Sequence, residues 1–323
     1  MDDLSAESIR EKVTSISEEM SKGIVGQQNL GRKLLMALFC GGHVLLEGLP
    51  GLAKTTAIKT LGSICELKFS RVQFTPDLLP ADVTGIEIYN MQKSDFTVKK
   101  GPIFANLVLA DEINRAPSKV QAALLEAMEE RQVTIGDTTY PLPEPFLVMA
   151  TQNPVEQEGT YPLPEAQLDR FLFKVVISYG TIDDEVEIMK RVAEGVFDTL
   201  HKRADKDFVN GVKEFAKTVT VSDEVRRYMA SLVFATRAPA EFGLSQFSGL
   251  IEYGASPRAS LALEKASRIS ALFEGRDFVT PSDVKSVATD ILRHRIKPTY
   301  EAEATHVTAD AIVEKVLDTV AVV

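Results

Sequence analysis

Apolar residues near the N-terminus recur at helical spacing, at Ile9, Val13, Ile16 and Met20. Residues three or four positions apart share one face of a helix, so this segment is predicted to be a helix that packs against the rest of the chain. The pattern stops at the GIVG run, residues 23–26, where glycine disfavours a helix.

Five short apolar runs rich in strand-forming residues follow, separated by helical stretches: 43–47, 67–74, 106–110, 145–150 and 172–177. Strands that alternate with helices are typical of a parallel sheet whose faces are covered by those helices. The sequence therefore predicts an α/β fold with a five-stranded parallel sheet flanked by helices.

The second half of the chain has helical periodicity with few strand signals, in segments 185–196, 206–219, 223–237, 258–273 and 281–296. The run YGTIDD, residues 179–184, supplies a glycine and a capping aspartate before the first of these segments. We therefore predict an α/β domain at 1–181 and a C-terminal all-α domain at 182–323.

Two segments of the α/β half look like additions to a minimal sheet. Residues 84–103 contain two strand-like runs around a polar middle, and residues 131–145 contain two more around Gly136 and Asp137, a turn-forming pair. We expect an insertion and a hairpin that are free to contact a substrate or a neighbouring subunit.

Composition narrows the functional classes. The chain has 45% hydrophobic residues, which is typical of a soluble protein. Its net charge of −10 does not favour nonspecific binding to nucleic acid or anionic lipid. Cys40 and Cys65 suit a reducing cytoplasm better than a disulfide framework. No apolar stretch is long enough to span a membrane, so we expect a cytoplasmic protein without direct membrane insertion.

The run GLPGLAKT at 48–55 lies between an apolar strand and a helix-like stretch. Glycines let backbone N–H groups surround phosphate oxygens, Lys54 can reach the β and γ phosphates, and Thr55 can offer a hydroxyl to Mg²⁺. Ala53 stands where such loops have a second glycine, which we expect to be tolerated with a negative φ. The expected nucleotide-binding set is Gly48, Pro50, Gly51, Leu52, Ala53, Lys54, Thr55 and Thr56.

An acidic pair, Asp111 and Glu112, ends the third apolar run. Asp111 can hold Mg²⁺ together with Thr55, while Glu112 can orient or deprotonate the water that attacks the γ phosphate. Asn153 follows the next run and could bond that water or a phosphate oxygen. The sequence thus predicts hydrolysis of a nucleoside triphosphate, and the absence of an N-K-x-D run agrees with ATP.

Three arginines are candidates for further roles. Arg170 precedes the fifth run and suits a finger inserted into a neighbouring site, or a surface salt bridge with Asp169 or Glu165. Arg258 follows Pro257 in the first turn of a predicted helix and could report the state of the nucleotide. Arg115 could contact a neighbouring subunit or pair with Glu126 or Glu129. The four histidines show no metal-ligand spacing.

Several longer runs together resemble the MoxR family of AAA+ ATPases, from about residue 20 to 300. They are GIVGQ (23–27), GLPGLAKT (48–55), RVQFTPDLLPADVTG (71–85), LADEINRAPSKVQAALLEAMEE (109–130), ATQNPVEQEGTYPLPEAQLDRF (150–171) and GASPRAS (254–260).

The resemblance implies a P-loop AAA+ core with a helix-2 insertion, a pre-sensor hairpin and a helical lid. It implies sensor 1 at Asn153, an arginine finger at Arg170, sensor 2 at Arg258, and an adenine pocket lined by Ile24 and Val25. It also implies ATP and Mg²⁺ as cofactors, a homo-oligomeric and usually hexameric ring, protein clients that are remodelled or matured, and partners with von Willebrand factor A domains.

The leading hypothesis is therefore an ATPase ring that remodels protein clients. The alternatives are a motor on nucleic acid, a chelatase-type motor subunit, and a nucleotide-held switch or scaffold with slow turnover. A nucleic-acid motor predicts a basic pore, yet the insertion sets Lys93, Lys99 and Lys100 against Glu87 and Asp95, so we expect no nucleic-acid partner.

Overall fold

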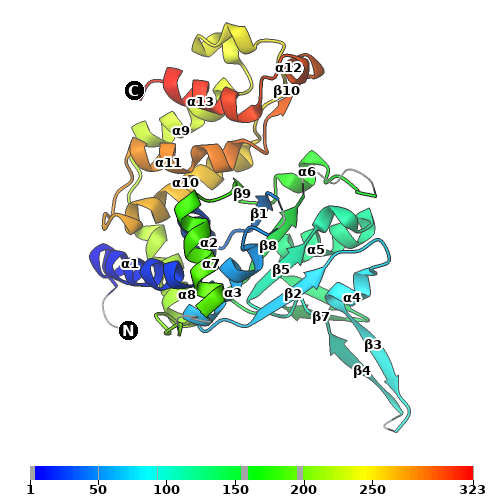
Figure 1. Cartoon of the computed structure of the whole chain (residues 1–323). Helices are drawn as coiled ribbons and strands as arrows, with labels where there is room; N and C mark the ends of the chain where they lie inside the picture. The colour runs from blue at the N-terminus through cyan, green and yellow to red at the C-terminus, as the bar shows by residue number, and fades with distance from the viewer. Residues whose placement is uncertain (1–3, 50, 93, 154–158, 195–198, 323) are drawn as a thin grey trace. The chain divides into compact units, whose positions relative to one another are not determined.

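The computed structural model describes residues 4–322 apart from 50, 93, 154–158 and 195–198 (Figure 1). The chain forms two compact units. The sheet unit comprises Thr14–Phe171 and Val175–Asn210; the helical unit comprises the stretch up to Val13, Leu172–Lys174 and the chain from Gly211 onward. The domain boundary at 181 and 182 stays a prediction, and the compact unit that holds the sheet continues past it.

The first helix, α1, spans Ala6–Gly23. All four residues of its apolar stripe, Ile9, Val13, Ile16 and Met20, are at most 3% exposed. The helical spacing in the sequence was therefore sufficient to identify the buried face of α1.

The sheet has five strands in the order β2-β5-β8-β1-β9. Their bounds are Val44–Glu47 (β1), Phe69–Gln73 (β2), Leu107–Asp111 (β5), Leu147–Gln152 (β8) and Phe173–Val176 (β9). Each predicted strand is present, and the parallel five-stranded sheet is confirmed. The strands β5 and β8 are buried apart from their last residues, as expected of parallel strands covered on both faces.

Strand register brings several polar residues to the same edge of the sheet. Gln73 pairs with Asp111 across β2 and β5, and Glu47 pairs with Gln152 across β1 and β8. Because parallel strands end at one edge, the side chains at their carboxyl ends meet there.

Several helices lie before, between and after the strands along the chain. They are α2 (Gln28–Cys40), α3 (Lys54–Ile64), α4 (Pro80–Thr84), α5 (Ser118–Glu130), α6 (Glu165–Leu168) and α7 (Ile182–Glu194), with the 3₁₀ turn η1 at Ile113–Arg115. Apolar residues of β5, β8 and α5 pack together: Val108, Ala110, Val148, Ala150, Val120, Leu124, Leu125 and Met128. This packing holds α5 against β5 and β8.

Both additional segments form antiparallel hairpins, as predicted. The insertion contains β3 (Gly85–Asn90) and β4 (Asp95–Lys100), and the second hairpin contains β6 (Gln132–Ile135) and β7 (Thr138–Pro141). Figure 1 shows β3 and β4 extending away from the five-stranded sheet. The apolar residues Ile86, Ile88, Tyr89, Met91 and Phe96 of this hairpin are 46–87% exposed.

From α8 onward the chain is mainly helical, with α8 (Lys206–Phe215), α9 (Asp223–Ala235), α10 (Pro257–Phe273), α11 (Pro281–Leu292), α12 (Tyr300–Ala304) and α13 (Ala309–Thr319), and 3₁₀ turns at Ala216–Thr218, Pro239–Phe242 and Ser245–Phe247. The helical unit also contains a short antiparallel ladder of β10 (Ile251–Tyr253) and β11 (Lys297–Pro298), which the helical periodicity did not indicate. None of the described helices is long and apolar enough to cross a membrane.

Candidate nucleotide site

The phosphate-binding loop connects β1 to α3, as the sequence predicted. The Lys54 ammonium folds back and donates a hydrogen bond to the Gly48 carbonyl oxygen. A side chain at Gly48 could not be accommodated, because its Cβ would lie 2.4 Å from a side-chain carbon of Ile177. The loop therefore needs glycine at position 48 for space.

Ala53 departs from expectation. Its φ is +54° and its ψ is 22°, a left-handed conformation, so the prediction of a negative φ is wrong. N-cap residues are usually extended, but here the phosphate-binding loop turns into α3 through two residues with positive φ, Gly51 at +85° and the N-cap Ala53. A left-handed alanine costs about 1–2 kcal/mol, and such strain persists where the surrounding structure fixes it.

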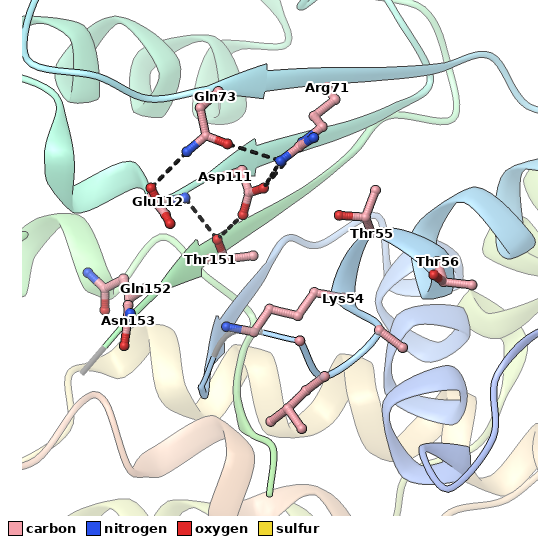
Figure 2. Close-up of a pocket in the computed structure, with 13 residues that line it drawn as sticks. Lys54, Thr55, Thr56, Arg71, Gln73, Asp111, Glu112, Thr151, Gln152 and Asn153 are labelled. Atoms are coloured by element: carbon pink, nitrogen blue, oxygen red, sulfur yellow. Dashed lines mark hydrogen bonds and ion pairs between the residues drawn. The ribbon is translucent and has the colours of Figure 1, made fainter. Parts of the chain in front are cut away.

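A cleft of about 440 Å³ opens beside this loop. Its lining residues come from the start of α3 and from the carboxyl ends of β2, β5 and β8, as Figure 2 shows. They are Gly51, Leu52, Ala53, Lys54, Thr55, Thr56, Arg71, Gln73, Asp111, Glu112, Thr151, Gln152 and Asn153. Nine of these are residues that the sequence analysis selected.

Asp111 is the centre of a hydrogen-bonded network in this cleft. Its Oδ2 accepts from the Arg71 guanidinium at 2.6 Å and its Oδ1 accepts from the Thr151 hydroxyl at 2.7 Å. The Asp111 side chain is 17% exposed, whereas the Arg71 side chain is 49% exposed. The carboxylate is thus oriented from two sides while its cation partner faces the open cleft.

Glu112 leaves the strand in a left-handed conformation, with φ 56° and ψ 50°. Its backbone N–H donates to the Thr151 hydroxyl at 2.8 Å. Its carboxylate Oε2 accepts from the Gln73 amide at 2.8 Å and lies 3.0 Å from Nε of Arg115. Arg115 therefore has an ion pair with Glu112 that the sequence alternatives did not include.

The charge of Lys54 is poorly solvated. Burial lowers the pKa of its ammonium from the usual value, while the carboxylates of Asp111, Glu112 and Glu47 raise it. A cation that has lost part of its hydration gains more from a bound anion than one in open solvent does.

The lining residues fit a nucleoside triphosphate with a divalent cation. Ala53 has no side-chain acceptor to cap α3, so the start of this helix presents N–H groups and the positive end of its dipole to the cleft. Asp111 and Thr55 offer the oxygen ligands that Mg²⁺ prefers. In the part of the chain that the structure describes, no cluster of three or more His, Cys, Asp and Glu residues could hold a metal; Mg²⁺ commonly completes its shell with water and phosphate instead.

Asn153 lines the same cleft at the end of β8, the strand next to β1. Arg170 does not line it: its guanidinium donates to the Leu125 carbonyl oxygen at 2.7 Å and lies 3.9 Å from the Glu129 carboxylate, both on α5. The role of Arg170 as a finger stays a prediction.

The remaining selected residues lie elsewhere or are not described. Ile24 is buried and Val25 half-buried in the link between α1 and α2, and neither lines the cleft. Arg258 lies in the first turn of α10, after the N-cap Ser256 and Pro257. Pro50 lies outside the described residues.

Sequence reasoning missed Arg71, Gln73, Thr151 and Gln152, which line the cleft with the selected residues. The available signal was position, because each is at or near the carboxyl end of a predicted parallel strand. This signal becomes useful only when the order of the strands in the sheet is known. Gln73 pairs with Asp111 only because β2 is next to β5.

Comparison with known proteins agrees with this architecture. Residues 43–173 match the model of the ATPase family associated with various cellular activities (AAA), and residues 247–316 match the AAA lid domain. Chaperone MoxR1 of Mycobacterium tuberculosis is 47% identical over 303 residues, which cover 94% of this chain and 80% of that protein.

Two further relatives support the same assignment. The uncharacterized protein YeaC of Bacillus subtilis is 43% identical, with 94% of this chain and 93% of that protein covered. The crystal structure of a proposed ATPase from Cytophaga hutchinsonii is 50% identical, has a TM-score of 0.93, and is matched over 98% of this chain and 97% of that chain. With its P-loop cleft, parallel sheet and lid match, the chain belongs to the MoxR family of AAA+ ATPases.

Proposed function

We propose that this ATPase binds Mg²⁺ and ATP in the cleft at the carboxyl edge of the sheet and couples hydrolysis to remodelling of protein clients. The observation that carries the proposal is the meeting of Lys54, Asp111, Glu112 and Asn153 around one cleft. Each of these residues supplies a different requirement of phosphoryl transfer.

In this proposal the chain's own residues divide the chemistry. Lys54 and the N–H groups at the start of α3 hold the phosphates. Glu112 orients a water and accepts its proton, and Asn153 bonds that water or a γ-phosphate oxygen. Gln73 and Arg115, which contact the Glu112 carboxylate, restrict where this base can point.

Thr55 and Asp111 would hold Mg²⁺, which neutralises charge on the transferred phosphoryl group when bound. The Thr151 hydroxyl orients Asp111 through Oδ1 and leaves the Oδ2 side to Arg71. Because Arg71 is half exposed, it can move away from the carboxylate at little cost.

We place the site at a boundary between copies of this chain in a ring, which the resemblance gives as hexameric. Arg170 of one copy would enter the cleft of the next, Arg258 would sense the nucleotide, and Ile24 and Val25 would line the adenine pocket. Support comes from the position of Arg170 after α6, where it contacts α5 and does not line its own cleft.

Protein clients are supported by a relative that is named a chaperone, Chaperone MoxR1. A partner with a von Willebrand factor A domain and a cytoplasmic location rest on the resemblance and on composition. A second candidate, a nucleotide-held switch with slow turnover, is favoured by the contacts that restrain Glu112.

The test is the ATPase rate per subunit against protein concentration, with mass measured by light scattering in ATP and Mg²⁺. The Glu112→Gln variant serves as the non-hydrolysing reference. We expect specific activity to rise as larger assemblies form. A monomer with negligible turnover at every concentration would contradict the ring ATPase and favour the switch.

A mixing experiment tests the arginine finger. Arg170→Ala should bind ATP normally and fail to turn it over, a loss of about 10³- to 10⁵-fold for such arginines. Mixing it with Glu112→Gln should restore activity, because some boundaries then combine an intact Glu112 with an intact Arg170. If the two variants are shown to assemble together and activity still does not recover, Arg170 does not act in the site of a neighbouring subunit.

A further inference from the structure

A buried amide joins two loops of the sheet unit. Gln121 on α5 is fully buried, and its Nε2 lies 3.2 Å from the Ile113 carbonyl oxygen, 3.1 Å from that of Ala116 and 2.9 Å from that of Tyr161. An amide nitrogen has two N–H donors, so these three backbone acceptors share them. The side chain therefore fixes main chain from two separate segments.

The first segment follows the hydrolytic glutamate. Ile113 begins the η1 turn directly after Glu112, and Ala116 follows the turn. Arg115 within the turn lies 3.0 Å from the Glu112 carboxylate. The backbone of Glu112 has a left-handed conformation, which is strained and persists only where the surrounding structure holds it. By holding carbonyls at the start of the turn and just after it, Gln121 restrains the path of the chain that leaves Glu112.

The second segment leads to the proposed finger. The Tyr161 N–H donates to the Asn114 carbonyl oxygen at 2.6 Å, so the two segments also contact each other directly. The chain then continues through α6 to Arg170, whose guanidinium donates to Leu125. Gln121 and Leu125 are four residues apart on α5 and thus share one face of the helix.

We propose that Gln121 is a positioning residue that locks the segment after Glu112 to the segment that carries Arg170. The hydrolytic carboxylate of one site and the arginine offered to the next site then keep one relative position. This inference rests on the proposed function, because it assigns hydrolysis to Glu112 and action between subunits to Arg170.

The primary variant is Gln121→Met, which keeps the length of the side chain and removes both donors. The control is Leu124→Met, a change of a buried residue on the same helix that removes no hydrogen bond. We expect Gln121→Met to retain ATP affinity and to lose about 10- to 100-fold in kcat, while Leu124→Met stays close to the wild type. A parallel fall of affinity and kcat would make Gln121 a structural residue and overturn the proposal.

Hydrogen exchange supplies a readout other than activity. With a non-hydrolysable ATP analogue, residues 113–116 and 161–163 of the wild type should gain protection together. In Gln121→Met the two segments should respond separately, while α5 and the central strands remain protected. Uniform loss of protection through the sheet unit, or joint protection in the variant, would contradict the lock.

Mixing separates the two sides of the lock. Mixing Gln121→Met with Glu112→Gln or with Arg170→Ala should restore no activity, because both Glu112 and Arg170 are displaced in each Gln121→Met subunit. Rescue by either one would show that only one segment depends on Gln121. If Glu112→Gln and Arg170→Ala fail to rescue each other, the proposed finger is wrong, whereas the hydrogen-exchange result still decides the lock.

A second variant protects the test against a folding defect. Gln121→Leu also removes both amide donors, and as an uncharged side chain of similar size it places no charge at the buried site. It should reproduce the separation of kcat from ATP affinity. Loss of the folded state in both variants would assign Gln121 to stability alone and overturn the proposal.

Discussion

Two carboxylate clusters of the sheet unit use the same chemistry in different surroundings. In the fastening cluster, Glu19 of α1 accepts from the Arg203 guanidinium at 2.6 Å, from Lys22 at 3.1 Å and from the His201 backbone N–H at 3.0 Å. In the cleft cluster, Asp111 and Glu112 accept from Arg71, Gln73 and Thr151, with Arg115 nearby.

Exposure separates the two clusters. The Glu19 side chain is 1% exposed, whereas those of Asp111 and Glu112 are 17% and 30% exposed. The difference lies in the carboxylates, since the cations are 38–41% exposed around Glu19 and 40–49% exposed in the cleft. A half-exposed ion pair is worth about 0–1 kcal/mol because water and salt replace it readily. The fastening cluster thus holds α1 to the 201–203 segment, while the cleft cluster keeps partners that can be exchanged for a ligand.

Glu112→Gln should show the largest difference between the two clusters, with a large effect on catalysis and a small effect on stability. Loss of the general base should lower kcat by about 10²- to 10⁴-fold, while ATP binding remains and unfolding free energy changes by less than about 1 kcal/mol. Steady-state ATPase assays measure kcat, a nucleotide titration measures ATP binding, and urea unfolding measures the free energy of unfolding. The control Glu126→Gln changes an exposed glutamate of α5. A large loss of stability would place Glu112 with the fastening carboxylates.

Lys54→Ala tests the cation that the cleft prepares for phosphate. Truncating one partner of a buried charged pair costs about 2–5 kcal/mol, so ATP affinity should fall by about 30-fold or more. Titration calorimetry with ATP and Mg²⁺ measures the change. Retained affinity with reduced turnover would move Lys54 from binding to the chemical step.

Arg71→Met tests whether partners in the cleft are exchangeable. Removing the half-exposed arginine should change stability by less than about 1 kcal/mol and, by freeing Asp111, lower the Mg²⁺ concentration for half-maximal ATPase by up to about fivefold. A metal titration of ATPase at saturating ATP gives this number. A higher Mg²⁺ requirement would instead assign Arg71 to holding the nucleotide.

The difference between the clusters also explains what the sequence could predict. The strands, α1, both hairpins, Lys54, Asp111 and Glu112 were identifiable because periodicity and short motifs are local. The left-handed Ala53 was not, because the alanine type alone does not reveal how sharply the chain reverses there. The β10–β11 ladder was missed because β11 has only two residues.

Contacts between distant segments were beyond the sequence. Glu19 and Arg203 are 184 residues apart, and Gln121 reaches Tyr161 from a position 40 residues away. Neither pair has a motif, since each depends on how α1 and α5 are placed against other elements. The partner of Arg115 was missed for a different reason: its alternatives were sought along α5, while the left-handed Glu112 turns its carboxylate back toward the same turn.

Glu19→Gln is the counterpart in the fastening cluster and should have the smallest effect on catalysis. Hydrogen bonds from the His201 backbone and from Arg203, with Lys22 nearby, lower the pKa of Glu19 from 4.5 to about 2. ATP affinity and kcat should remain, whereas the midpoint of thermal unfolding should fall at pH 7. The control Glu66→Gln removes an exposed pair with Lys202 and should leave the midpoint nearly unchanged.

The pH dependence of this variant sharpens the assignment. Because the folded-state pKa of Glu19 lies below its ordinary value of 4.5, its contribution to stability is complete above about pH 4.5 and is lost as pH falls toward about 2. The difference in unfolding midpoint between the wild type and Glu19→Gln should therefore stay constant from pH 7 to 5 and narrow below that. A difference that persists unchanged at pH 3 would mean that the packing of Glu19, rather than its charge, fastens α1.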